Sequence, residues 1–182
     1  MRKVVATMFM TLDGVVQDPQ KWSFPYWGDE TQAFKIEELR KTDALLLGRT
    51  TYEGFAQAWP SRSGDEMSDT FNSMPKFVVS KTLVKADWNN SHILRGDLAQ
   101  EVSALKAKPG KDLVVHGCPQ LVRGLLEKGL LDQLNLLVYP IVLGEGKRLF
   151  GEGQQAKLKL IEAKPFKEGV VLMVYEKAAH TN

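Results

Sequence analysis

The sequence predicts a three-layer α/β/α domain, in which helices cover both faces of a mostly parallel mixed sheet that ends in an antiparallel hairpin. Two observations support this prediction. Over most of the chain, short apolar runs alternate with stretches of helical periodicity, which is the pattern of repeated strand–helix units. Near the C-terminus, apolar and charged residues alternate with a period of two, which is typical of antiparallel strands.

The first strand is expected at residues 4–10. The segment Met1-Arg2-Lys3 followed by apolar residues also resembles the start of a signal peptide. However, Thr7 and Thr11 interrupt the run, Asp13 closes it, and no small-residue cleavage site follows. No apolar run reaches the roughly 20 residues that cross a bilayer. We therefore expect a cytoplasmic protein without a membrane partner.

The next elements follow from periodicity and composition. Residues 30–41 are predicted to be helical, because the apolar residues Ala33, Ile36 and Leu39 recur at helical spacing. The continuous apolar run 44–47 is typical of a strand buried on both faces of a sheet. The other elements expected in this half are a helix at 50–58, a loop at 60–74 with one short helix after Gly64, and strands at 77–79 and 92–94.

The helix after residue 97 has the clearest end signals. Asp97 is the expected N-cap, Gln100 completes a capping box, and Pro109-Gly110 ends the helix. The remaining expected elements are a strand at 113–115, a helix from Pro119 to a stop at Gly129, a strand at 134–138, a glycine-rich loop at 144–153, and hairpin strands around 158–160 and 170–175.

Composition limits the class of protein without naming its chemistry. The 182 residues suit one domain, expected over 1–178 and followed by a flexible tail at 179–182. A net charge of +2 gives no argument for nucleic acid as a partner. One cysteine excludes an internal disulfide, and with three histidines it argues against a structural metal site. The motifs at the strand ends must therefore identify the function.

Ligands of parallel α/β sheets bind beyond the carboxyl ends of the strands, and three of the expected strand ends here carry groups that suit anions. The first is Gly48-Arg49-Thr50-Thr51, where a glycine and an arginine precede a helix N-terminus. The second is Ser80-Lys81-Thr82, with two hydroxyls and an ammonium. The third is His116-Gly117-Cys118-Pro119-Gln120, which opens another helix. Together they favour a ligand with several phosphates, such as a dinucleotide with a 2′-phosphate.

Each strand end also has a simpler interpretation. The first could be a glycine turn with a threonine helix cap and a solvated arginine, and the second could be a polar turn. Cys118 has no evident partner base beyond His116, which disfavours a catalytic cysteine.

Several segments, taken in order and spacing, resemble a known family. They are Thr11-Leu12-Asp13-Gly14, residues 47–53, residues 76–83, Val115-His116-Gly117, residues 125–132 and residues 140–150. These segments resemble the dihydrofolate-reductase-like superfamily. More closely, they are similar to the reductase domain at the C-terminal end of bifunctional riboflavin-biosynthesis deaminase-reductases.

This resemblance implies an NADPH-dependent reductase, similar to 5-amino-6-(5-phosphoribosylamino)uracil reductase of riboflavin biosynthesis. It implies that Gly48 to Thr51 line the cofactor phosphates and that Ser80, Lys81 and Thr82 lie near the adenosine ribose and its 2′-phosphate. It also implies that Leu12 and Gly14 lie by the nicotinamide and that the protein is a homodimer. The residues implied to cradle the pyrophosphate are Gly117, Cys118, Pro119, Gln120 and Leu121.

The sequence also departs from these families. No H-x-E with P-C-x-x-C occurs, so the deaminase half is absent. Gly117-Cys118 stands where dihydrofolate reductases carry a glycine pair. Tyr52-Glu53-Gly54-Phe55 stands where the riboflavin enzymes tend to carry acidic residues, which leaves the substrate open.

The predicted chemistry is hydride transfer to a small heterocyclic or sugar-derived substrate. Asp13 is the first candidate for a catalytic or substrate-orienting group, because it ends the first strand beside the predicted nicotinamide. Asp29 is the second candidate acid, with a helix N-terminal charge as its simpler interpretation.

Three further residues are candidates for substrate binding. Lys147 and Arg148 could hold a substrate phosphate or form a solvated basic loop. Trp22, like Phe24, Trp27 and Trp59, could stack on a flat ring or pack in the core. Two other functions stay open: a pteridine reductase of the dihydrofolate-reductase type, and a non-catalytic nucleotide-binding dimeric protein.

Overall fold

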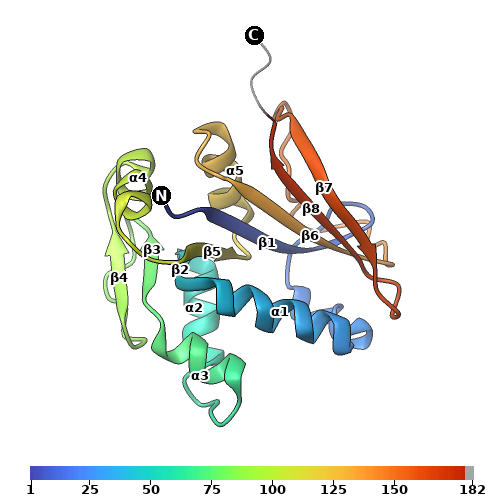
Figure 1. The fold of residues 1–182 in the computed structure, drawn as a ribbon, viewed down its shortest axis with the longest axis horizontal. Coiled ribbons are helices and arrows are strands. Elements are labelled where there is room, and N and C mark those ends of the chain that lie inside the picture. Colours follow the sequence, from blue (N-terminus) through green and yellow to red (C-terminus); the bar gives the residue numbers. More distant parts are fainter. Residues whose placement is uncertain (179–182) are drawn as a thin grey trace.

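Eight strands form one sheet in the order β4-β3-β2-β5-β1-β6-β8-β7 (Figure 1). The computed structural model describes residues 1–178, and the tail expected at 179–182 lies outside this range. Strands β4 to β6 of this order pair in parallel, and β8 runs antiparallel to both of its neighbours. The strands are β1 Val4–Thr11, β2 Thr42–Gly48, β3 Lys76–Val79, β4 Ser91–Leu94, β5 Asp112–His116, β6 Gln133–Tyr139, β7 Leu158–Pro165 and β8 Val171–Lys177.

Five α-helices cover the two faces of the sheet. They are α1 Asp29–Lys41, α2 Arg49–Ala58, α3 Glu66–Ser73, α4 Leu98–Ala107 and α5 Pro119–Glu127, with single 3₁₀ turns at Pro19–Lys21 and Phe24–Tyr26. Val102 of α4 and Leu125 of α5 belong to the core on one face, and Tyr52 of α2 and Phe71 of α3 belong to the core on the other. The predicted three-layer architecture with a C-terminal antiparallel hairpin is confirmed.

Two local predictions about helix starts are corrected. Asp97 caps α4 as expected, since its carboxylate accepts hydrogen bonds from the N–H groups of Ala99 and Gln100. In place of the reciprocal bond expected between Gln100 and the Asp97 N–H, the structure has Glu101 accepting the N–H of Gly96, the residue before the cap. The helix α2 begins at Arg49 with Gly48 as its N-cap and without a side-chain cap, so the threonine cap is wrong.

The buried face of α1 is not the one that its regularly spaced apolar residues mark. Leu39 is buried, but Ala33 is exposed and Ile36 is half-buried. The buried positions of α1 are Thr31, Lys35, Glu38 and Leu39. This helix therefore presents charged side chains to the sheet. None of the helices within residues 1–178 has the length and apolar character that a membrane crossing requires.

Candidate functional site

The carboxyl ends of β2 and β5, which are adjacent strands, meet in direct contact. Gly48 ends β2, and Cys118 lies at the N-cap of α5 just after β5. A Cβ atom on Gly48 would lie 2.1 Å from Cys118 Sγ, so this approach requires glycine. Gly117 has a φ of 63°, and a Cβ atom there would lie 3.1 Å from Thr51 Oγ1. The structure therefore brings the first and third predicted segments together.

Two helix N-termini point to this meeting place. Neither α2 nor α5 has a side chain that caps its first turn. Their first N–H groups and their positive dipole ends are therefore suited to an anion. Pro119 at the start of α5 removes one of these donors, while Gln120 in the same turn is exposed and Leu121 is buried. Thr50 is exposed in the first turn of α2.

Arg49 joins the second predicted segment to the first. Its guanidinium donates hydrogen bonds to Glu53 at 2.8 Å and to the hydroxyl of Thr82 at 2.9 Å. The Ser80 hydroxyl accepts the N–H groups of Thr82 and Leu83, so Ser80 builds the polar turn itself. The side chains of Lys81 and Thr82 are exposed, and Thr82 contacts Arg49. All three strand-end segments thus lie on one edge of the sheet.

The Asp13 side chain links the end of β1 to the glycine-rich loop at 144–153 through hydrogen bonds. Its carboxylate accepts hydrogen bonds from the Thr11 hydroxyl at 2.6 Å and from the N–H of Gly144 at 2.9 Å. The guanidinium of Arg148 lies 4.0 Å from it and also donates to the Asp13 backbone carbonyl. The hydrogen bond from Thr11 is the main cause that lowers the pKa of Asp13 to about 2. Asp13 is therefore a carboxylate near neutral pH and has no proton to donate.

The other predicted residues near β1 lie around these Asp13 contacts. Leu12 is exposed, and its N–H donates to the Ile141 carbonyl. Gly14 has a φ of 85° and turns the chain after Asp13. Lys147 is exposed, and its N–H donates to the side chain of Gln17. These residues and the loop form one rim beside the first strand.

Two further predicted residues take up simpler positions. Asp29 is exposed in the first turn of α1, where a carboxylate interacts favourably with the helix dipole. Trp22 is buried, donates its indole N–H to the Gln17 carbonyl and packs edge-on against Tyr139. These placements match the simpler interpretations of both residues, and their roles toward a ligand stay predictions.

A hollow of about 480 Å³ lies between α1 and the segment that joins α2 to α3. Trp59 borders this hollow, and the Arg62 guanidinium lies 5.0 Å from the centre of its ring. The rest of the lining is Gln32, Ser61, Ser63, Asp65, Met67 and Ser68. An aromatic surface beside a cation suits a flat ring that carries an anionic group.

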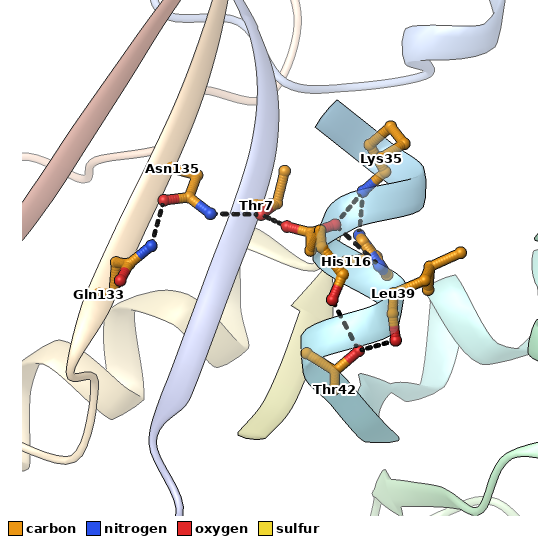
Figure 2. Close-up of polar contacts among 8 residues, drawn as sticks. Thr7, Lys35, Leu39, Thr42, His116, Gln133 and Asn135 are labelled. Carbon is orange, nitrogen blue, oxygen red and sulfur yellow. Dashed lines mark hydrogen bonds and ion pairs between the residues drawn. The ribbon is translucent and has the colours of Figure 1, made fainter. Parts of the chain in front are cut away.

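Beneath these surfaces lies a buried polar cluster that the sequence did not predict (Figure 2). Lys35 and Glu38 of α1 form an ion pair, and the Lys35 ammonium lies 3.2 Å from His116 Nδ1. The Thr7 hydroxyl donates to Glu38, and Asn135 donates to Thr7 at 3.1 Å. We call these five residues the Lys35–Glu38 cluster.

Electrostatics keep the cluster in a defined charge state. Burial, and then the neighbouring Lys35 cation, lower the pKa of His116 to about 3, so the imidazole is neutral. Burial opposes ionisation of Glu38, but the charge of Lys35 and the hydrogen bonds from Lys35 and Thr7 outweigh it and lower the pKa of Glu38. A Lys and a Glu three residues apart in a helix were the available sequence signal, but such pairs are usually solvated.

Comparison with solved structures identifies the class to which this fold belongs. A protein provisionally assigned to riboflavin biosynthesis from Shewanella sp. PV-4 matches with a TM-score of 0.77 at 20% identity, over 97% of this chain and 99% of that chain. Dihydrofolate reductase from Enterococcus faecalis, complexed with NADP(H), matches with a TM-score of 0.66 at 16% identity over 97% of both chains. The fold is therefore that of the dihydrofolate-reductase-like superfamily.

The family is identified from the sequence itself. Residues 2–172 match the RibD C-terminal domain, and the chain belongs to that family. It is 30% identical to the uncharacterized protein YyaP of Bacillus subtilis, over 96% of this chain and 94% of YyaP.

The deaminase-reductase of Thermotoga maritima shows how this chain relates to the bifunctional enzymes. It matches with a TM-score of 0.69 at 15% identity, over 97% of this chain but 57% of that longer chain. The predicted resemblance to the reductase half of these enzymes is confirmed.

Proposed function

We propose that this protein is an NADPH-dependent reductase that transfers a hydride to a small heterocyclic or sugar-derived substrate. The observation that carries the proposal is the contact of Gly48 with Cys118, which brings two uncapped helix N-termini together. Arg49 follows Gly48 directly and contacts Thr82, the neighbour of Lys81, and the two cations would supply positive charge for a 2′-phosphate. The dihydrofolate reductase of Enterococcus faecalis, which has a similar fold, is complexed with NADP(H), and this supports the choice of ligand.

The residues at the strand ends would have different roles. NADPH would supply the hydride, and the chain would supply binding and orientation. Gly48 to Thr51 and Gly117 to Leu121 would hold the phosphates, with Ser80 shaping the turn that presents Lys81 and Thr82. Leu12 and Gly14 would border the nicotinamide. Asp13, because it is ionised and tied to the loop, would orient these groups rather than donate a proton.

The substrate would occupy the space between this edge and the hollow at Trp59. The aromatic ring and the Arg62 guanidinium fit a heterocycle with an anionic substituent, as in the ribosylaminouracil phosphate of the riboflavin pathway. Lys147 and Arg148 would be a second phosphate contact, on the opposite rim. A pteridine substrate is the alternative that the dihydrofolate-reductase fold itself supports.

Cofactor preference tests the proposal directly. NADPH and NADH are titrated by fluorescence into the wild type, Arg49→Ala and Arg40→Ala, the last being a control arginine in an exposed ion pair with Glu66. We expect a preference for NADPH and a loss of about tenfold or more for NADPH alone in Arg49→Ala, since charge-assisted hydrogen bonds contribute roughly 1.5–3 kcal/mol. Equal losses for both cofactors would contradict the role of Arg49.

Turnover tests the substrate class. NADPH oxidation is followed with dihydrofolate and, separately, with the ribosylaminouracil phosphate. Oxidation with the uracil compound would support the riboflavin-type activity, and oxidation with dihydrofolate alone would support the pteridine alternative. NADPH binding with no oxidation of either would favour a different substrate or the non-catalytic nucleotide-binding protein.

A further inference from the structure

His116 stands where the core joins the candidate nucleotide site. It is the last residue of β5, and its backbone continues directly into Gly117 and Cys118. Both of those residues have left-handed backbone conformations, with φ values of 63° and 53°. Because two successive left-handed residues define a sharp turn, the orientation of the strand end at His116 sets where the turn begins.

The side chain of His116 is fixed from the α1 side. Lys35 is an ammonium and can only donate, so His116 Nδ1 accepts and the ring proton is on Nε2. His116 Nε2 lies 3.6 Å from Glu38, beyond ordinary hydrogen-bond length, and has no hydrogen-bond partner in the described chain. The Lys35 contact therefore determines both the tautomer and the ring orientation.

Aromatic rings hold the same imidazole from the other helices. Phe71 of α3 packs edge-on against it with ring centres 5.6 Å apart, and Phe55 of α2 lies 6.4 Å away. Trp59, which borders the hollow, stacks on Phe71 at 4.5 Å. His116 is thus linked through Phe71 to Trp59, which borders the hollow, and it also lies at the start of the Gly117–Cys118 turn.

The cluster extends this support across the sheet. Glu38 holds Lys35 in place and accepts the hydroxyl of Thr7 on the central strand β1. Asn135 on β6 donates to Thr7 and accepts from Gln133 at 2.8 Å. A buried ion pair is a weak source of stability, since an apolar pair of similar size often serves as well. Stability alone therefore does not explain why a charged pair is buried here.

We propose that Lys35 and Glu38 are positioning residues, which orient His116 and through it set the Gly117–Cys118 turn for nucleotide binding. This inference rests on the proposed function, because the turn is assigned to the cofactor pyrophosphate. It assigns no contact with the substrate to Lys35 or Glu38.

The decisive variant is Lys35→Met/Glu38→Gln, which leaves no lone buried charge and keeps an acceptor for the Thr7 hydroxyl. Its control is Lys41→Met/Glu37→Gln on the same helix, an exposed pair 3.1 Å apart. We expect both proteins to fold with stabilities near that of the wild type. The buried double variant should bind NADPH at least tenfold more weakly, and the control should bind it as the wild type does.

The ring of His116 gives a readout that a merely structural role would not move. In ¹⁵N spectra of the wild type, Nδ1 should be unprotonated and Nε2 protonated. Lys35→Met removes the cation that lowers the pKa of His116 and leaves Glu38, so the titration should move to higher pH. Glu38→Gln removes the attraction that raises this pKa, so the titration should not move to higher pH.

The outcomes separate the two proposals. If the wild type binds no NADPH, the proposed function fails, and the amide signals of Gly117 and Cys118 still test the positioning. Shifts of these amides in the buried double variant, and not in the control, support it. A folded double variant with unchanged NADPH affinity and unchanged Gly117 and Cys118 amides would overturn the inference.

Discussion

The candidate site depends on the absence of a Cβ atom at Gly48. Its backbone conformation is extended, with a φ of −82°, so any residue could adopt it. The position cannot accommodate a larger side chain, because Cys118 Sγ occupies the space that a Cβ atom would need. The sequence predicted a glycine for close approach at this strand end, but it did not identify the partner, which is 70 residues away in the chain.

Gly48→Ala should therefore destabilise the protein by about 1–3 kcal/mol through overpacking and weaken nucleotide binding. Cys118→Ala added to it should restore part of both losses, since the nearest remaining atom would be the Cys118 Cβ at 3.2 Å. Gly54→Ala in the same helix, which has no atom within 4 Å, is the control and should be neutral or stabilising. Urea unfolding and NADPH titration measure these effects, and a harmless Gly48→Ala would contradict the packing argument.

The burial of Lys35 and Glu38 could not be predicted from the sequence. The residue types at the strand ends carry their chemistry in the local sequence, and the structure brings those segments to one edge. A charged pair in a helix has no local signal for burial, because only the contacts with Thr7 and His116 make burial tolerable. The location of this charged pair follows from the tertiary structure, which cannot be inferred from sequence periodicity alone.

At the scale of elements, the alternation of apolar runs predicted nearly every helix and strand. The errors are in the ends of elements, where single side chains decide. For α4, the prediction placed a reciprocal bond from Gln100 to the N-cap, whereas in the structure Glu101, one residue further on, accepts the N–H of Gly96. Both residues can reach back to the start of a helix, and the local backbone angle selects between them.

This difference has a measurable consequence. Asp97→Ala should lower the free energy of unfolding by about 1 kcal/mol, because two N–H groups of α4 lose their acceptor. Gln100→Ala should stay within about 0.5 kcal/mol of the wild type, as is usual for exposed sites. Chemical denaturation of the two variants decides the matter, and equal losses would restore the predicted capping box.

At the scale of the whole molecule, the homodimer expected from the family resemblance remains a proposal. The strand β7 lies at the edge of the sheet, and Leu160 and Ile161 on it are each 49% exposed. An edge strand with exposed apolar side chains is a common site of pairing with another chain.

We expect light scattering after size-exclusion chromatography to give the mass of two chains for the wild type. Leu160→Lys/Ile161→Lys should shift the protein toward one chain, since it places charge on the apolar edge. Val84→Lys, which changes an exposed apolar residue of a distant loop, is the control and should leave the mass unchanged. A monomeric wild type would contradict the proposal.

The central place of β1 also affects how the chain must fold during synthesis. Val4 to Thr7 pair with Leu113 to His116, and Val5 to Thr11 pair with Gln133 to Tyr139. The strand β1 therefore has no strand partner until more than a hundred further residues have been made. Such distant pairing slows folding and leaves apolar edges uncovered in the meantime. We therefore expect chaperones to bind the nascent chain until β5 and β6 have been made.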